Sequence, residues 1–449
     1  MDQAQKEELI EYLVENCGAI PSQDENGDLD YRRDTEDRLQ YEYALRKVIE
    51  EYFDIHQLGV TAGDLHQDLM AVALELATPK ESGDEFYPVD ETVDDDGLVE
   101  VFESKINRIK ADIGRSDEIT FTVWFPWQIS WQNDPGSFEV YDLSIERAPD
   151  SEWSEKLDEL QADPDAFDAG QIKRKTEETD FDYWKTTISA KSPSYAFSYF
   201  SSAFKLLSAK INHSRNYLSG DTFDRREGTL PGHTGIDARW TVIQKPFAVL
   251  WEDDRTEATV GTDRGFQGCN LYYDIDLEPV EVDYSTIEDR YESHRSFDWT
   301  SDSQPRLHNA LLGYQDGLIA SDHIHSFFSF WRVLEELTLA ERQNKESVVE
   351  KALFGLRVVT DDKVDPVIIQ IADDIWETRN NWVHDPGWKK IAEAHEVVAK
   401  LLADAMIELH NTTFSEIDET MMRRVLKWGI ESEDKRSEVE EALELISEL

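Results

Sequence analysis

The spacing of apolar residues changes twice along the chain. Through the first 115 residues they recur every three or four positions, which is the spacing of one buried face of a helix. This spacing predicts a mostly helical N-terminal region, residues 1–115, with amphipathic helices at 1–18, 36–55, 63–77 and 98–112.

From residue 116 to residue 300, runs of β-branched and aromatic residues replace the helical spacing. The runs at 119–125 and 138–145 flank the turn sequence Asn-Asp-Pro-Gly and predict two strands of a hairpin with a long loop. We therefore expect a sheet-containing α+β domain over 116–300 with a sensor or regulatory role, either separate from residues 1–115 or forming one unit with them. Its other expected elements are strands at 240–243, 247–251 and 271–275 and helices at 151–161 and 194–211.

Beyond a polar linker at 298–305 the strand pattern ends and helical spacing returns. This predicts an all-α bundle over 305–430, followed by an acidic helical tail at 431–449. The fold class is thus multidomain α+β, with an N-terminal mixed α/β region before a C-terminal helical bundle. The expected bundle helices are 306–320, 322–340, 348–358, 367–384 and 389–410.

Charge is the most unusual bulk property. The chain has 96 acidic and 45 basic residues, a net charge of −51, and the acidic residues are spread along its whole length. This composition resembles that of proteins from salt-accumulating archaea, in which carboxylates keep a surface hydrated and salt screens their repulsion. The alternative is an acidic protein that repels nucleic acid and binds basic partners. The bundle is less acidic, with 21 acidic and 14 basic residues over 305–430, so it is the region better suited to an anionic partner.

Several classes of protein and site are disfavoured by simple features. No run approaches 18 apolar residues, so we expect no membrane span, and the acidic N-terminus without an apolar signal segment favours a cytoplasmic location. Cys17 and Cys269 are too few for a disulfide framework or a zinc site. His323 and His325 would lie on different faces of a helix, and no glycine-rich phosphate loop is present. We expect neither a metal nor a cofactor.

One helix ends in a group of residues that has chemical potential. Its predicted apolar stripe runs through Ile368, Ile371, Ile375, Thr378 and Trp382, and it closes with the sequence Arg-Asn-Asn-Trp-Val-His at 379–384.

Arg379 is suited to hold a phosphoryl oxygen and His384 to exchange a proton near neutral pH, while Asn380 shares a helix face with His384. Together they suffice for metal-free RNA cleavage, in which a 2′-hydroxyl attacks the adjacent phosphate. The alternative is that Arg379 caps or pairs within the helix and His384 interacts with its dipole.

The Arg-x4-His spacing, with Asn380 directly after the arginine, resembles the signature of the HEPN superfamily. The preceding helix supports this, since its sequence Phe-Phe-Ser-Phe-Trp-Arg-Val-Leu-Glu-Glu-Leu at 327–337 is similar to a helix common in ApeA-like HEPN proteins. The resemblance covers roughly residues 305–410. It implies a HEPN-like bundle with two copies of the motif facing each other across a homodimer.

The resemblance also implies roles for individual residues. His384 would be the general acid and base, Arg379 would stabilise developing charge, and Asn380 would orient one of them or the scissile phosphate. We add Glu335 or Glu336 as a supporting residue for Arg379, because both belong to the preceding helix.

The implied function is that of a metal-independent endoribonuclease, whose substrate is RNA. In antiviral defence it would be an effector of the abortive-infection or toxin type. A protein or nucleic-acid trigger would act on the N-terminal region. The alternatives are a non-catalytic HEPN module that binds nucleotides or RNA or acts as a scaffold, and an interaction protein whose acidic N-terminal region binds a basic partner.

Overall fold

The computed structural model describes most of the chain. The described residues form two compact units, the first comprising Met1–Phe121, Ile188–Phe200 and Asp253–Asp263, and the second Thr122–Thr187, Ser201–Glu252 and Arg264–Leu449. Within these bounds the described residues are 3–16, 22–23, 29–30, 35–79, 86–88, 95–127, 129–161, 169–178, 181–218, 242–243, 246, 248–253, 264–268, 280–294, 296–297, 305–320, 322–339, 347–361, 363–384 and 391–431.

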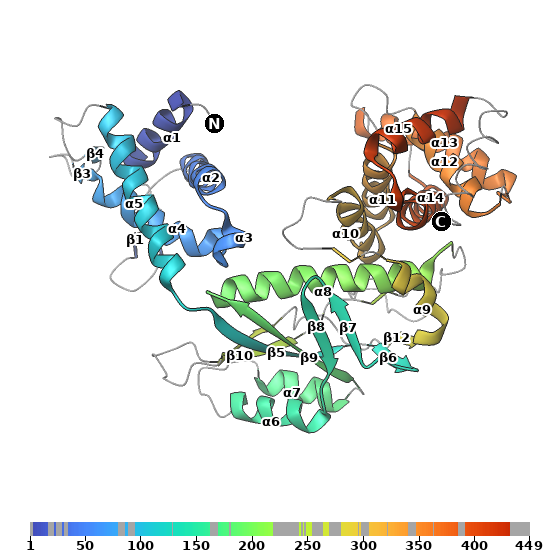
Figure 1. The fold of residues 1–449 in the computed structure, drawn as a ribbon, viewed down its shortest axis with the longest axis horizontal. Coiled ribbons are helices and arrows are strands. Elements are labelled where there is room, and N and C mark those ends of the chain that lie inside the picture. The colour runs from blue at the N-terminus through green and yellow to red at the C-terminus, as the bar shows by residue number, and fades with distance from the viewer. Residues whose placement is uncertain are drawn as a thin grey trace. The chain divides into compact units, whose positions relative to one another are not determined.

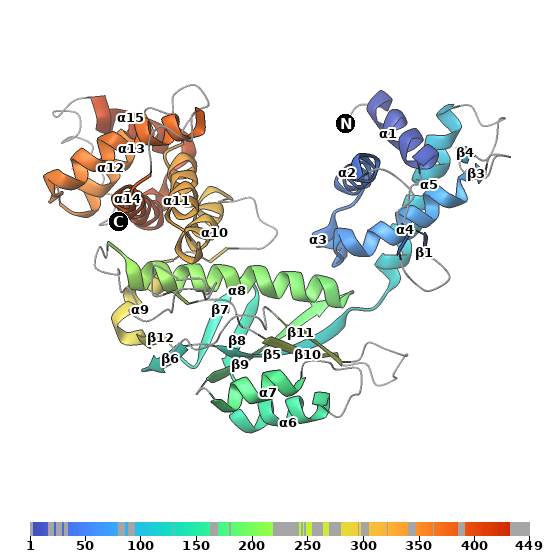
Figure 2. The same cartoon turned by 180° about the vertical axis from the view of Figure 1, so that it is seen from behind.

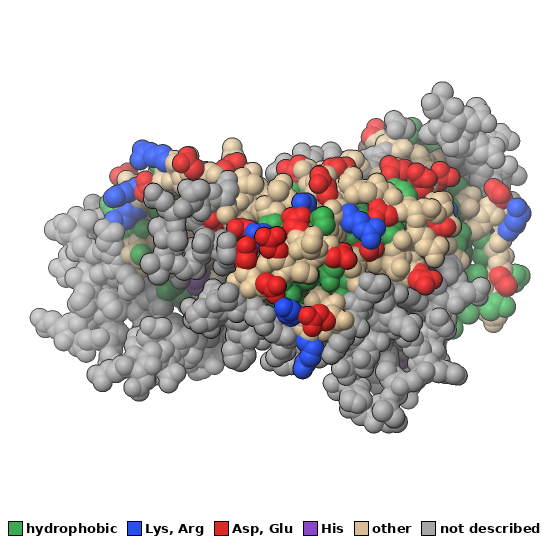
Figure 3. Space-filling view, turned by 90° about the horizontal axis from the view of Figure 1, so that it is seen from below, with side chains coloured by type: hydrophobic (Ala, Val, Ile, Leu, Met, Phe, Trp, Pro, Cys, Tyr) green, Lys and Arg blue, Asp and Glu red, His purple; other side chains and the backbone are tan. Residues whose placement is uncertain are grey.

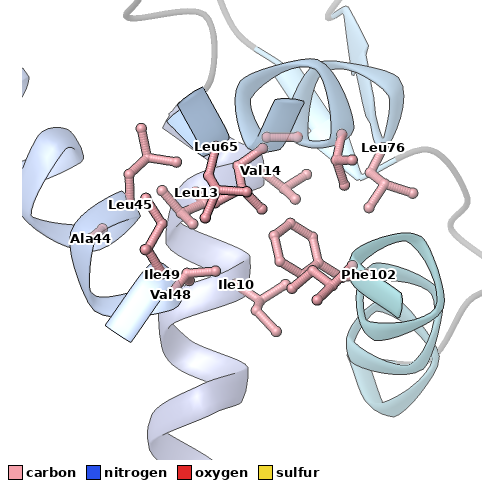
Figure 4. Close-up of a cluster of buried hydrophobic side chains, with 14 of the residues drawn as sticks. Ile10, Leu13, Val14, Ala44, Leu45, Val48, Ile49, Leu65, Leu76 and Phe102 are labelled. Carbon is pink, nitrogen blue, oxygen red and sulfur yellow. The ribbon is translucent and has the colours of Figure 1, made fainter. Parts of the chain in front are cut away.

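The first unit is built on helices whose apolar faces meet in one core. Figure 4 shows Ile10 and Leu13 of α1, Leu45 and Val48 of α2 and Phe102 of α5 converging there, and all five are buried. Burial of such a face is what stabilises amphipathic helices of this length. The helices are α1 (Gln3–Asn16), α2 (Thr35–Tyr52), α3 (Ile55–Leu58), α4 (Ala62–Glu75) and α5 (Asp95–Arg115), with short strand pairs β1 (Ser22–Gln23) and β2 (Leu29–Asp30), and β3 (Ala77–Pro79) and β4 (Phe86–Pro88).

Most of a six-stranded sheet belongs to the second unit, and helices cover both of its faces (Figures 1 and 2). Residues of β5 alternate between these faces: Trp124 packs with Trp153 of α6, while Phe125 contacts Phe204 of α8 at 5.3 Å. In sheet order the strands are β11 (Arg264–Gly268), β10 (Ala248–Asp253), β5 (Ile119–Trp127), β9 (Asp182–Ala190), β8 (Leu143–Arg147) and β7 (Ser137–Val140), and the helices are α6 (Asp150–Gln161), α7 (Ala169–Glu178) and α8 (Pro193–Asn216).

A parallel strand pair and one further helix complete the sheet region. β6 (Ile129–Gln132) pairs with β12 (Val280–Asp283), which leads directly into α9 (Tyr284–Ser293). Asp283 caps α9 by accepting a hydrogen bond from the Ser285 N–H at 3.1 Å.

The C-terminal helices pack around α14, which is buried on nearly all sides. α14 contacts α10, α11, α12 and α13. α10 and α11 approach closely because Gly317 leaves room for Phe330, whose ring would lie 2.7 Å from a Cβ at that position. The helices are α10 (Pro305–Ile319), α11 (His323–Leu337), α12 (Ser347–Val359), α13 (Pro366–His384), α14 (Glu393–Thr412) and α15 (Glu419–Glu431), with a 3-10 turn, η2, at Phe414–Glu416.

The strand predictions fared less well than the helix predictions. The segment 138–145 was predicted as one strand but contains two, β7 and β8, which turn at Tyr141 with a left-handed φ of 53°. Val242 and Ile243 are not in a strand, contrary to the expectation for 240–243. The sequence also gave no indication of β9, α7 or α9, while the expected strand at 271–275 and the tail at 432–449 lie outside the described residues.

Two observations bear on the predicted acidic surface and on the predicted absence of a membrane span. Acidic side chains are scattered over the face drawn in Figure 3. Within the part of the chain that the structure describes, no helix is both long and apolar enough to cross a membrane.

Candidate functional site

The candidate site is at the C-terminal half of α13, a helix whose start is fixed by a side-chain cap. Asp365 Oδ1 accepts a hydrogen bond from the Val367 N–H at 2.8 Å. Pro366 occupies the first helical position, where no intrahelical hydrogen bond is lost. The start of the helix therefore agrees with the prediction from sequence.

The apolar stripe predicted for α13 is buried only toward the end that carries the motif. Ala372, Ile375 and Thr378 are fully buried, whereas Ile368 and Ile371 are half-buried. The C-terminal half of the helix is thus the part anchored in the bundle. This anchoring fixes the backbone that carries Arg379.

Arg379 lies beside a pair of indole rings, whose centroids are 6.0 Å apart, and next to a carboxylate. Its guanidinium carbon is 5.7 Å from the ring centroid of Trp331 and 5.9 Å from that of Trp376. Arg379 Nη2 donates to Glu335 Oε1 over a long 3.5 Å, and Arg379 Nε is buried without a hydrogen-bond partner. The side chain is 17% exposed. The guanidinium is therefore confined but only weakly hydrogen-bonded by its own chain.

The two candidate supporting glutamates point to different partners. Glu335 Oε1 also accepts a 2.8 Å hydrogen bond from the Trp331 indole, so its position is fixed from within α11. Glu336 instead pairs with Arg306 of α10 at 3.6 Å. The structure thus brings Glu335, and not Glu336, to Arg379.

The other motif residues continue along the same helix. Asn380 is half-buried, and His384 is the last residue of α13; its side chain, like that of Trp382, lies outside the described residues. At 3.6 residues per turn, the backbone positions of Arg379 and His384 are about 140° apart around the axis, while those of Asn380 and His384 are about 40° apart. Arg379 and His384 therefore do not share a helix face within one chain.

A second histidine beside α13 has a structural role. His395 Nδ1 accepts a hydrogen bond from the Ala392 N–H at 3.0 Å, at the start of α14. His395 Nε2 is 3.2 Å from Asp374 Oδ2, an oxygen that also accepts from Thr378 at 3.4 Å. Both ring nitrogens of His395 are occupied, so this pair fastens α14 to α13.

Sequence reasoning missed a buried polar network that joins α8 to α14. Lys400 and Asp404 are fully buried and 2.8 Å apart. The Lys400 ammonium also donates to the carbonyl of Asn216, and Asp404 Oδ2 accepts from the Leu218 N–H at 3.1 Å. The ion pair thus satisfies backbone groups at the C-terminal end of α8, which no residue of α8 itself could reach.

Two buried histidines extend this network. Asn411 Nδ2 lies 2.6 Å from His294 Nδ1, His294 Nε2 lies 3.1 Å from His213 Nδ1, and His213 Nε2 lies 3.3 Å from the carbonyl oxygen of Asp404. Because that carbonyl can only accept, His213 must carry its proton on Nε2. His294 then donates from Nε2 and accepts from Asn411, so both rings are neutral with every nitrogen satisfied.

Burial opposes any additional charge in this network. It lowers the pKa of His213 to about 3, with smaller contributions from the charges of Lys400 and Arg290, and it lowers the pKa of His294 for the same reason. Burial also raises the pKa of the Asp404 carboxyl, while the Lys400 ammonium opposes that rise.

A sequence signal for the network does exist on α14. Lys400, Asp404, Glu408 and Asn411 recur at helical spacing, and they define a polar stripe on a helix whose remaining faces are apolar. A polar stripe on a helix is ordinarily exposed to solvent. Here α8 and α9 pack against the stripe of α14 and bury it.

Comparisons of the chain with protein-family models, with curated proteins and with solved structures found no match. Among the residues that the structure describes, no group of three or more histidine, cysteine, aspartate or glutamate side chains is placed to hold a metal ion.

Proposed function

We propose that this chain is a metal-independent endoribonuclease of the HEPN type. One observation carries the proposal: Arg379 packs beside two contacting indoles and next to Glu335, with most of its hydrogen-bonding capacity unused. An arginine that served only to brace helices would be expected to use that capacity internally. A phosphodiester supplies the acceptor oxygens that such a guanidinium lacks.

The proposed reaction is cleavage by the neighbouring ribose. The His384 imidazole takes the proton of a 2′-hydroxyl, whose oxygen attacks the adjacent phosphorus while the bond to the 5′-oxygen breaks. Arg379 donates to the non-bridging oxygens as their negative charge grows. Return of a proton to the leaving 5′-oxygen yields a 2′,3′-cyclic phosphate and a 5′-hydroxyl.

A homodimer is part of this proposal. The backbone positions of Arg379 and His384 are about 140° apart around α13, which favours a site shared between two chains. Two copies of α13 packed across a two-fold axis would supply Arg379 from one chain and His384 from the other. Asn380, which shares a face with His384, would then orient the imidazole or the scissile phosphate.

The biological role follows from the expected domain division. We propose that the N-terminal region, residues 1–300, responds to a protein or nucleic-acid trigger and releases the nuclease as a defence effector. A cytoplasmic location belongs to the same proposal.

The alternative function is a non-catalytic HEPN module that binds RNA or nucleotides or acts as a scaffold. The ion pair between Arg379 and Glu335 favours it, since the carboxylate already compensates the charge of the guanidinium. The two functions predict opposite results in one assay.

The assay is cleavage of total RNA by the full-length protein in molar KCl with EDTA present. The wild type should cleave, and His384→Ala and Arg379→Ala should each lower the rate by at least about a hundredfold, as expected for loss of a general base or of charge stabilisation. Mass spectrometry of the products should detect 2′,3′-cyclic phosphate ends.

His325→Ala is the matched control, because this histidine of α11 is 81% exposed and pairs with the cap residue Asp322. It should cleave like the wild type. RNA binding without cleavage in all four proteins would establish the non-catalytic alternative, and cleavage abolished by EDTA would place the chemistry elsewhere.

A further inference from the structure

The solvent-facing side of α15 carries basic and apolar residues in a chain whose charge is strongly acidic. Four exposed residues fall within an arc of about 120° around this helix and form its outer face: Met421, Arg424, Lys427 and Trp428. The helix has three basic and two acidic residues, whereas the whole chain has 45 and 96. The outer face is therefore a place where the chain can attract an anion.

The apolar part of the outer face is exposed although the helix itself is closely packed. Trp428 is 40% exposed and Met421 is 39% exposed. Every other tryptophan side chain that the structure describes is buried or half-buried. The opposite side of α15 packs tightly on α12, because a Cβ at Gly429 would lie 2.6 Å from the ring of Phe354. The indole thus remains at the surface of a firmly seated helix, and tryptophan and arginine are residues enriched in binding surfaces.

α15 is attached to the part of the bundle that carries the candidate site. Figures 1 and 2 show it as an outer helix of the C-terminal bundle. Arg423 Nη1 donates to the carbonyl oxygen of Leu339, just beyond the end of α11, at 3.2 Å. Glu335, in the last turn of α11, is the residue that pairs with Arg379. α15 and Arg379 are therefore both held at the C-terminal end of α11.

We propose that the outer face of α15 binds a single-stranded stretch of RNA. One base stacks on the exposed indole of Trp428, and the phosphates beside it are attracted by Arg424 and Lys427. An acidic peptide would supply the negative charge but no base to cover the indole. The choice of RNA over another anion rests on the proposed nuclease function, because RNA is the substrate of that reaction.

Stacking and charge attraction should respond differently to salt. At 1 M salt the Debye length is about 3 Å, so the attraction of phosphates to exposed cations is weak. Stacking on an indole needs no charge and is not screened in this way. RNA binding in molar KCl should therefore depend mainly on Trp428, and the contribution of Arg424 should grow as the KCl concentration falls.

The test is fluorescence anisotropy of a labelled, unstructured single-stranded RNA with the full-length protein, at several KCl concentrations and with EDTA present. Every protein also carries His384→Ala, so that binding is measured without cleavage. Trp428→Ala should raise Kd about tenfold at each KCl concentration, as expected for loss of one stacked base. Arg424→Ala should reduce the slope of log affinity against log KCl concentration by about 0.7, which corresponds to one phosphate of a single strand.

Tyr43 of α2 provides the matched control. It is 62% exposed, and the Lys47 ammonium lies 5.6 Å from its ring centroid, so an aromatic ring and a cation are again exposed together. Here, however, Glu50 pairs with Lys47 at 2.6 Å and compensates its charge. Tyr43→Ala should bind RNA as the His384→Ala parent does. Trp428→Phe, which keeps an aromatic ring, should bind much more tightly than Trp428→Ala.

Equal Kd values for Trp428→Ala and the parent would overturn the proposed surface. Equal binding of duplex RNA, whose base faces are covered, or of polyglutamate, which has charge without bases, would overturn it as well. If circular dichroism shows that Trp428→Ala does not fold, the salt slope of Arg424→Ala decides, and an unchanged slope would exclude the outer face.

Failure of the nuclease proposal would give a different result. Total RNA would then stay intact with the wild type, while binding of the single-stranded RNA would still depend on Trp428. Conversely, cleavage by the wild type together with unaltered binding by the α15 variants would leave the nuclease in place and remove the RNA surface.

Discussion

Two ion pairs in the second unit show how differently a chain can use opposite charges. Lys400 and Asp404 are fully buried, lie 2.8 Å apart and also hold the backbone at the end of α8. Arg379 and Glu335 are 17% and 24% exposed and meet over 3.5 Å, with the arginine Nε unpartnered. The pair of Lys400 and Asp404 therefore has a structural role. In the pair of Arg379 and Glu335, the arginine can replace its contact with Glu335 by a contact with a ligand.

The largest effect should come from breaking the buried pair. Asp404→Leu leaves the Lys400 ammonium buried without its counter-ion and should lower the free energy of unfolding by about 3–5 kcal/mol. Lys400→Met/Asp404→Leu should recover only part of that loss, because no charge then remains unpaired but the Asn216 carbonyl and the Leu218 N–H lose their partners. Chemical denaturation followed by tryptophan fluorescence measures both.

Arg423 and Glu419 of α15 form the matched control pair, with the same four-residue spacing but at the surface. Glu419→Leu should cost less than about 1 kcal/mol. Equal losses at the two sites would mean that the environment of Lys400 and Asp404 is not as dry as their burial indicates.

The second effect is a dependence of the free energy of unfolding on pH. Since the folded pKa of His213 is about 3, below the usual value of 6.5, the unfolded chain binds a proton between these values that the folded chain does not. Stability should therefore fall as the pH falls from about 6.5 towards 3. His213→Gln should show a shallower fall in unfolding free energy between about pH 7 and about pH 5. An unchanged slope would mean that His213 is not held neutral.

Glu335→Gln should separate positioning from stability. The amide keeps an acceptor for the Trp331 indole but removes the charge opposite Arg379, so stability should change by less than about 1 kcal/mol. If the nuclease proposal holds, misplacement of Arg379 should lower kcat roughly tenfold to a hundredfold with little change in KM. Glu336→Gln should leave kcat unchanged, because Glu336 pairs with Arg306.

The smallest effect is the response of the two pairs to salt. Double-mutant cycles at two concentrations of KCl should give a coupling energy for Arg379 and Glu335 of at most about 1 kcal/mol that decreases at the higher concentration. The coupling of Lys400 with Asp404 should stay nearly constant, since ions do not reach it. Parallel decreases would contradict the contrast between the pairs.

The bundle helices could be predicted closely because each has a long apolar face and clear end signals. Asp322 caps α11 and Asp365 caps α13, as residue types at these positions suggest. The strands were harder: in β9 the charged Lys185 interrupts the run, although Thr186 and Thr187 themselves favour a strand. The tight turn at Tyr141 lacks the glycine or asparagine that normally marks a left-handed position.

In the candidate site, too, some contacts could be predicted from the sequence and others could not. A partner for Arg379 among Glu335 and Glu336 could be anticipated, since these residues lie on helices whose buried faces were recognised from spacing, but the structure was needed to single out Glu335. The contact between His213 and Asp404 could not, because it joins residues 191 positions apart and depends on how α8 packs against α14. Spacing along a helix identifies a face but not the element that covers it.

The dependence of α8 on Lys400 and Asp404 sets a limit on dissecting the protein. A fragment limited to residues 305–430 would keep α14 but lose Asn216, Leu218, His213 and His294, and four buried polar groups would face solvent or one another. The smallest excisable piece that retains this junction starts before α8, not at Pro305. Functional mapping by truncation should therefore cut on the N-terminal side of the sheet strands.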